Sequence, residues 1–189
     1  MEKIDKEAEK KFLEADNYRL NKDFEKAINI FKNLLEKYPN LPPALNNIAM
    51  CYTGLNQLDE AEKFYLKCLE IEPVSLLSIN NLAKLYFSSN QYRKALPLLR
   101  KSLIRKEDQI DVVEVIATCM FELRFIKETD NFCREAIKKF PKSEVLKNYY
   151  GKNLLRLNKH SEGQKYLNES SGVIEFGEEK FNIEKKWKD

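Results

Sequence analysis

Prolines at a fixed interval constrain this chain more than any other feature of its sequence. Pro39 and Pro73 lie 34 residues apart, and Pro141 follows after 68 residues, twice that interval. At the skipped position the chain has Glu107 instead. Self-similarity at a period of roughly 20–50 residues is typical of repeat architectures. The interval therefore predicts an array of 34-residue units.

Four other positions of the unit also hold the same kinds of residue. A small slot is followed three residues later by a large slot, and a second small slot is followed four residues later by a second large one. The first two slots hold Ala15, Ala49, Ala83, Ala117 and Gly151, then Tyr18, Tyr52, Tyr86, Met120 and Leu154. The other two hold Ala27, Ala61, Ala95, Thr129 and Gly163, then Phe31, Tyr65, Leu99, Cys133 and Leu167. Small residues let two helices approach closely, and large ones fill the gap beside them.

Each unit is predicted to contain two helices. Apolar residues recur at helical spacing, and turn residues divide the two helices at 21–23, 54–56, 88–90 and 157–159. The prolines end the second helix because proline lacks a donor and restricts the residue before it. Since one helix pair cannot bury its own apolar face, successive pairs are expected to stack.

The slots resemble the tetratricopeptide repeat over roughly residues 8–176. The resemblance implies an all-α fold, an α-solenoid of about five helix-turn-helix units in a single domain, 1–189. The expected repeats are 8–41, 42–75, 76–109, 110–143 and 144–172. Residues 173–189 are predicted to form a C-terminal capping helix, because solenoids need their last repeat covered. A connector toward a further module is the alternative for this tail.

Charge and hydropathy disfavour several kinds of partner. The 33 basic and 30 acidic residues give a net charge of +3 and are scattered, whereas nucleic-acid binders concentrate basic residues on one face. The charged N-terminus lacks the apolar stretch of a secretory signal. Since no apolar run approaches the roughly 18 residues of a spanning helix, membrane insertion is not expected. These features predict a cytoplasmic protein.

The sequence offers little for catalysis, so we expect no enzyme, no metal site and no cofactor. His160 is the single histidine, and there is no Gly-rich phosphate loop. The four cysteines, without a Cys-x-x-Cys pair, stand at helix-packing positions and are interpreted as reduced core residues. They are Cys51, Cys68, Cys119 and Cys133.

The resemblance implies that the first helix of each pair lines a concave, partner-binding surface. Asparagine pairs recur there one register apart, and an asparagine amide can bond both the N–H and the C=O of an extended peptide. The ladder resembles the superhelical repeats of O-linked N-acetylglucosamine transferases, which hold substrate peptides. The predicted partner is therefore a protein or peptide. The candidate contact residues are Asn46, Asn47, Met50, Asn80, Asn81, Lys84, Phe87, Phe121, Asn148 and Lys152.

Other functions of such a fold are weighed against this prediction. In the carboxylate clamp that some family members use for chaperone tails, only Asn47 matches here, and the other four slots hold Phe12, Asp16, Leu77 and Asn81. An accessory or targeting region of a modifying enzyme, such as a transferase, is the main alternative to a scaffold. RNA binding is disfavoured because acidic residues interrupt any basic track. The oligomeric state stays open.

Overall fold

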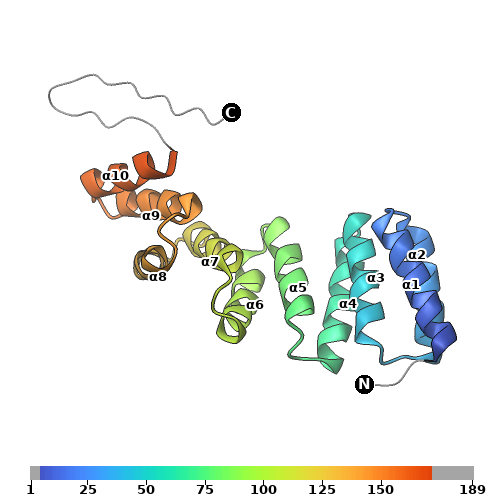
Figure 1. The fold of residues 1–189 in the computed structure, drawn as a ribbon. Coiled ribbons are helices and arrows are strands. Elements are labelled where there is room, and N and C mark those ends of the chain that lie inside the picture. Colours follow the sequence, from blue (N-terminus) through green and yellow to red (C-terminus); the bar gives the residue numbers. More distant parts are fainter. Residues whose placement is uncertain (1–4, 172–189) are drawn as a thin grey trace. The chain divides into compact units, whose positions relative to one another are not determined.

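A computed structural model describes residues 5–171 and shows ten α-helices in that range, with no strand among them (Figure 1). The helices come in pairs joined by short turns, which confirms the predicted all-α, five-pair organisation. The pairs are α1 (Lys6–Leu20) with α2 (Phe24–Lys37), α3 (Pro42–Gly54) with α4 (Leu58–Ile71), α5 (Leu76–Ser88) with α6 (Tyr92–Arg105), α7 (Ile110–Glu122) with α8 (Ile126–Lys139), and α9 (Glu144–Arg156) with α10 (His160–Ser171).

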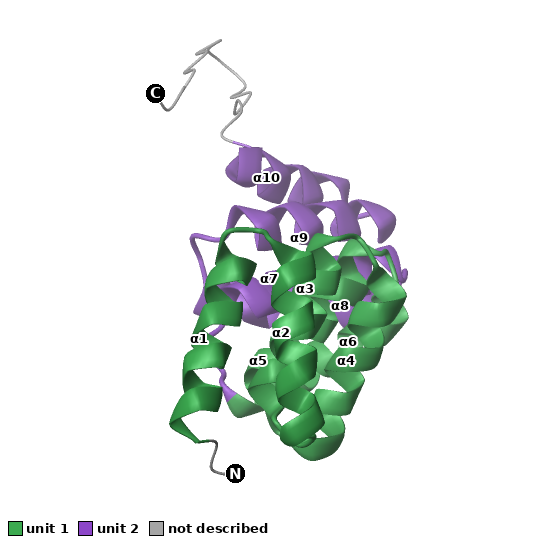
Figure 2. Cartoon of the chain, turned by 90° about the vertical axis from the view of Figure 1, so that its right-hand side faces the viewer, with its two compact units in different colours: residues 1–105 green, residues 106–189 purple. Residues whose placement is uncertain are grey.

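The chain divides into two compact units, Met1–Arg105 and Lys106–Asp189 (Figure 2). Unit 1 contains α1 to α6, and each helix packs on the next along the chain. Its first helices also pack together, α1 on α3 and α3 on α5. Unit 2 repeats this arrangement with α7 to α10, where α7 also contacts α9. That all five pairs form one domain stays a prediction.

The predicted packing slots lie inside the units. Ala15, Ala49, Ala83 and Ala117 are completely buried, and so are Ala27, Ala61 and Ala95 in the second small slot. The large residue that follows the second small slot is also buried at Phe31, Tyr65, Leu99 and Cys133. Burial of side chains of this size stabilises each helix pair by roughly 1.5–3 kcal/mol per large apolar residue. The slots predicted from the 34-residue register are therefore core positions in both units.

The turn inside each pair has the same backbone geometry. Its second residue has a positive φ, and the next N–H donates to the carbonyl five residues back, as Gln57 does to Tyr52 at 2.9 Å and Gln91 to Tyr86 at 2.8 Å. This is the Schellman ending of a helix, which satisfies its last carbonyl groups. The five residues with positive φ lie 34 residues apart: Lys22, Asn56, Asn90, Arg124 and Asn158.

The helix ends agree with the sequence signals. Helices α2, α4 and α8 end two residues before Pro39, Pro73 and Pro141. The N-terminus of α1 is capped by Asp5, whose side chain accepts from the Ala8 amide at 2.8 Å. Ser143 caps α9 in the same way. The tail 173–189, predicted to cap the last repeat, lies outside the described residues.

Candidate partner-binding surface

A chain of hydrogen bonds crosses the first helices of the three repeats in unit 1. It begins on α1, where Arg19 Nε donates to Asp16 Oδ1 at 2.8 Å. Asn47 Nδ2 on α3 donates to the same Asp16 oxygen at 3.0 Å. A carboxylate only accepts hydrogen bonds, so the nitrogen end of the Asn47 amide must face Asp16. The orientation of Asn47 is thereby determined by its neighbour on α1.

Asn46 continues the chain from α3 to α5. Its Nδ2 lies 3.5 Å from Asn47 Oδ1, and its Oδ1 accepts from Ser78 Oγ at 3.3 Å and from Asn81 Nδ2 at 3.2 Å. The side chain is only 2 % exposed. The prediction that Asn46 faces outward was wrong, because its amide is used to bridge two helices. Arg19, Asp16, Asn47, Asn46 and Asn81 are called the amide chain below.

The other predicted residues of unit 1 remain accessible to different degrees. Met50, Asn80, Asn81 and Phe87 are half-buried, as is Asn47. Lys84 is exposed. The Phe87 ring lies 5.7 Å from the ring of Tyr92 on α6, which holds it at the end of α5. The surface formed by α1, α3 and α5 therefore offers amides, a thioether, an aromatic ring and one cation.

Unit 2 has a different surface on its first helices. Phe121 on α7 is 8 % exposed, because the Arg156 guanidinium lies 3.5 Å from its ring centroid and Arg156 Nη1 donates to the Phe121 carbonyl at 2.8 Å. Phe121, one of the candidate contact residues, is therefore largely covered by its own repeat neighbours and not open to a partner. Lys152 lies over the Tyr149 ring at 5.4 Å, and Asn148 donates to Ser170 Oγ at 3.5 Å. Cation–π contacts, rather than amides, dominate this surface.

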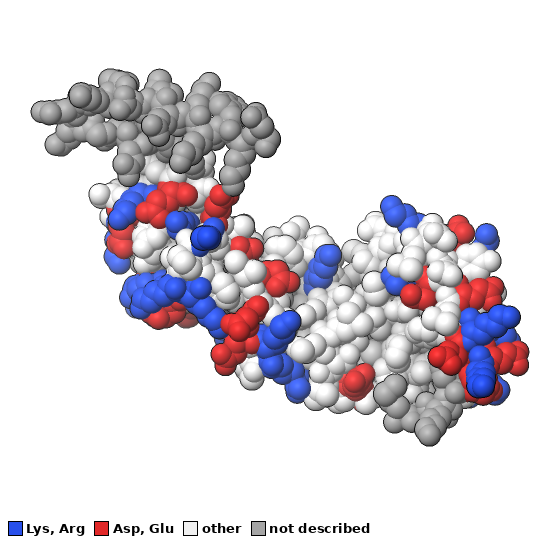
Figure 3. All heavy atoms as spheres, viewed as in Figure 1, with Lys and Arg blue, Asp and Glu red and all other residues white. Residues whose placement is uncertain are grey.

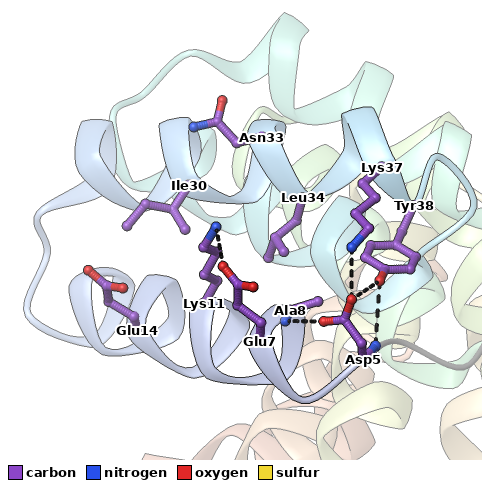
Figure 4. Close-up of a pocket in the computed structure, with 10 residues that line it drawn as sticks. All are labelled: Asp5, Glu7, Ala8, Lys11, Glu14, Ile30, Asn33, Leu34, Lys37 and Tyr38. Carbon is purple, nitrogen blue, oxygen red and sulfur yellow. Dashed lines mark hydrogen bonds and ion pairs between the residues drawn. The ribbon is translucent and has the colours of Figure 1, made fainter.

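A hollow of about 240 Å³ between α1 and α2 was not predicted (Figure 4). At one end, Asp5 Oδ2 accepts from Lys37 Nζ at 2.8 Å and from Tyr38 Oη at 2.9 Å. These bonds, the one from Lys37 above all, hold the pKa of the Asp5 carboxyl well below its usual range. Two ion pairs line the hollow, since Lys11 also pairs with Glu7 at 3.2 Å. The bonds from Lys37 and Tyr38 to Asp5 thus hold the start of α1 against the end of α2.

Comparisons with known proteins agree with this architecture. A family model described as tetratricopeptide repeat matches residues 18–77, and a second with the same description matches residues 75–108. Residues 18–108 belong to the tetratricopeptide repeat family. The two matches fall on the helix pairs whose slots hold the most regular residues.

Curated relatives with tetratricopeptide repeats are much longer than this chain. It is 26 % identical over 108 residues to Hsp70-Hsp90 organizing protein 1 of Glycine max, a match that covers 57 % of this chain and 19 % of that protein. It is 24 % identical over 97 residues to Hsp70-Hsp90 organizing protein 2 of Arabidopsis thaliana, covering 51 % and 17 %. The chain thus spans less than a fifth of the length of these relatives.

Solved tetratricopeptide repeat structures resemble the chain over most of its length. MamA from Desulfovibrio magneticus RS-1 has a TM-score of 0.79 at 14 % identity, over 90 % of this chain and 96 % of that one. YrrB, described as a TPR protein with an unusual peptide-binding site, has a TM-score of 0.74 at 15 % identity, over 82 % and 80 %. At these identities the likeness shows the fold alone. Family membership and the curated relatives together indicate protein–protein interaction.

The cysteines of these tetratricopeptide repeats lie in the core, as predicted. All four are free and buried. Burial raises the pKa of Cys51 and Cys119 to about 11 and that of Cys133 to about 12, and also raises the pKa of Cys68. Thiols with raised pKa values are poor nucleophiles at neutral pH.

The described part of the chain has neither a cluster of metal ligands nor a membrane-spanning helix. Between residues 5 and 171, no group of three or more His, Cys, Asp or Glu side chains is placed to hold a metal ion. Over the same residues, no helix has the length and apolar character needed to cross a membrane.

Proposed function

We propose that this chain is a non-catalytic scaffold that holds an extended segment of a partner protein against the α1–α3–α5 surface of unit 1. The observation that carries the proposal is the amide chain. Asn47 and Asn81 occupy equivalent positions one repeat apart, and both are half-buried and hydrogen-bonded to a side chain on the first helix of the preceding repeat. Side chains already fixed in place lose little conformational entropy on binding, which favours affinity.

Lys84 and Phe87 supply selectivity in this proposal. Main-chain contacts give affinity for an extended segment without reading its sequence, whereas pockets and charges beside them discriminate between side chains. Lys84 is exposed and Phe87 is half-buried, one helical turn apart on α5. A partner is thus held through its backbone by the amides and selected through its side chains at the end of α5.

Chaperone tails are not the partner we propose, although the curated relatives are named for organising Hsp70 and Hsp90. Asn47 is the single residue that matches the clamp for such tails, and the other four slots hold Phe12, Asp16, Leu77 and Asn81 in place of the clamp residues. The tail 173–189, which would distinguish a scaffold from an accessory region of a modifying enzyme, lies outside the described residues. The cytoplasm stays the predicted location.

A pull-down with matched variants tests the proposal. Wild-type chain and the double variant Asn47→Ala/Asn81→Ala are used as bait in a lysate of the source cell, and captured proteins are mapped to peptides. Each lost hydrogen bond is worth roughly 0.5–1.5 kcal/mol, so affinity for a mapped peptide should fall about ten- to a hundredfold. The loss should be similar for peptides of different sequence, because the contacts are to the backbone.

Two controls separate binding from stability. Asn29→Ala/Asn131→Ala removes exposed asparagines from α2 and α8 and should leave both binding and the thermal melt unchanged. Asn46→Ala should lower stability by about 1–3 kcal/mol, because Ser78 and Asn81 lose their buried acceptor. Unchanged affinity and an unchanged melt for the Asn47/Asn81 variant would exclude this surface as the binding site.

A further inference from the structure

Charge is distributed very unevenly over the first helices of unit 1. One third of the chain is Lys, Arg, Asp or Glu. Helix α1 carries charged residues in every turn, whereas α3 carries none and α5 carries only Lys84. Figure 3 shows a broad area with few charged side chains where α3 and α5 lie, next to densely charged α1 and α2. Charged residues are depleted in the same way at the cores of protein–protein interfaces.

The accessible side chains of α3 and α5 are called the neutral strip. They combine amides with apolar groups: Leu77 is 60 % exposed, Thr53 is exposed, and the others are half-buried. The amides can exchange hydrogen bonds with a peptide backbone. An acyl chain has no such groups and would leave the amides unpaired. The members of the strip are Asn47, Met50, Thr53, Leu77, Asn81 and Phe87.

The charges beside the neutral strip are of two kinds. Asp16 and Arg19 on α1 bind each other at 2.8 Å, and Asp16 also holds Asn47, so this pair presents no net charge. Lys84 on α5 is exposed, and it stands one repeat after Met50 in the same register. The strip therefore has a single net charge, positive, on its α5 side.

We propose that the neutral strip takes an internal, uncharged stretch of its partner, with one acidic side chain placed against Lys84. This inference deepens the proposed function and rests on it. A charged side chain or chain terminus laid on the strip away from Lys84 loses hydration and gains no counter-charge, which is costly. The strip thus excludes charged segments as well as attracting one acidic side chain, and specific interfaces commonly combine both effects.

Peptide display on the immobilised full chain tests this inference. One library places random twelve-residue segments between Gly-Ser linkers, and a second places the same segments at a free C-terminus. We expect the internal library to be enriched in segments with few charged residues and one aligned Asp or Glu. In a screen against Lys84→Glu, the aligned residue should shift to Lys or Arg. The affinity of this variant for the original segment should fall about tenfold. Arg93→Glu, a reversal at an exposed position of α6, is the matched control and should change neither.

The outcomes separate this inference from the proposed function. Enriched segments that are richly charged, that need a free C-terminus, or that bind Lys84→Glu unchanged would overturn the inference alone, provided Asn47→Ala/Asn81→Ala weakens their capture. Enrichment that is indifferent to the asparagines, or no enrichment from either library, would overturn the proposed function and with it this inference.

Discussion

At the scale of single residues, each turn contains one position with a left-handed backbone, and the residues found there tolerate this conformation to different degrees. The five residues with left-handed backbone have φ between 57° and 64°, and three of them are asparagine. Asparagine tolerates this region, whereas other non-glycine residues are disfavoured there. The sequence predicted the turns at Lys22, Asn56, Asn90 and Asn158 from neighbouring turn residues. It did not mark the one at Arg124, because Leu-Arg-Phe carries no turn signal.

Arg124→Asn should therefore stabilise unit 2. The substitution relieves the unfavourable φ of 58° without adding the backbone freedom of glycine, so we expect a gain of up to about 1 kcal/mol. Urea unfolding followed by circular dichroism measures the effect. Arg124→Lys keeps the conformational cost and is the matched control. A loss of stability in Arg124→Asn would mean that the arginine side chain makes a contact outweighing the strain.

Buried thiols make stability depend on pH above neutrality. The pKa of Cys133 is raised to about 12 by burial, and those of Cys51 and Cys119 to about 11, from an ordinary value near 9. As pH rises past 9, the unfolded chain releases thiol protons that the folded chain keeps. The free energy of unfolding should therefore fall by up to about 1.4 kcal/mol per pH unit for each such thiol.

Urea unfolding at pH 7.5, 9 and 10.5 tests this pH dependence. Cys133→Ala removes one titrating group and should flatten the decline above pH 9, although its stability at pH 7.5 is lower because the side chain is truncated. Native protein should also react slowly with a thiol reagent. Stability that stays constant from pH 7.5 to 10.5, or fast labelling of native protein, would contradict the buried, protonated state of these cysteines.

At the scale of elements, the last helix pair has glycine instead of alanine in both small slots, and its two backbones approach each other directly. A Cβ added to Gly151 would lie 2.8 Å from the Gly163 carbonyl oxygen, and one added to Gly163 would lie 2.9 Å from the Gly151 carbonyl oxygen. The backbones of α9 and α10 therefore touch at this crossing. The sequence predicted two small residues here, but it could not show that they face each other without any side chain between them.

Gly163→Ala should separate α9 from α10. Alanine favours a helix by about 1 kcal/mol over glycine, but the contact with backbone that cannot move aside should outweigh this and destabilise by about 1–3 kcal/mol. Ser161→Ala, at an exposed position of the same helix, is the control for helix propensity. Both variants are compared by thermal and urea unfolding. A Gly163→Ala variant as stable as wild type would show that the two helices can move apart without loss.

At the scale of the whole chain, periodicity predicted the architecture well and the surface less well. A 34-residue register identifies which positions repeat, so the helix pairs, the small slots and the buried cysteines could all be derived from it. It cannot show which neighbour turns toward a residue at the edge of a helix face. Asn46 is withdrawn from solvent by Ser78, and Phe121 by an arginine 35 residues later in the chain. Such contacts between neighbouring helices depend on the angle between successive helix pairs, and this angle cannot be derived from the 34-residue period.

The neutral strip also has a kinetic consequence. Complementary charges can accelerate association to about 10⁸–10⁹ M⁻¹ s⁻¹ at low salt, against about 10⁵–10⁶ M⁻¹ s⁻¹ without them. With Lys84 as its one net charge, the strip attracts little from a distance, so a segment reaches it by unguided diffusion. Its capture is slow and nearly indifferent to ionic strength, and occupancy is governed by how long the segment stays. A partner held in this way is released by competition rather than by a rise in salt.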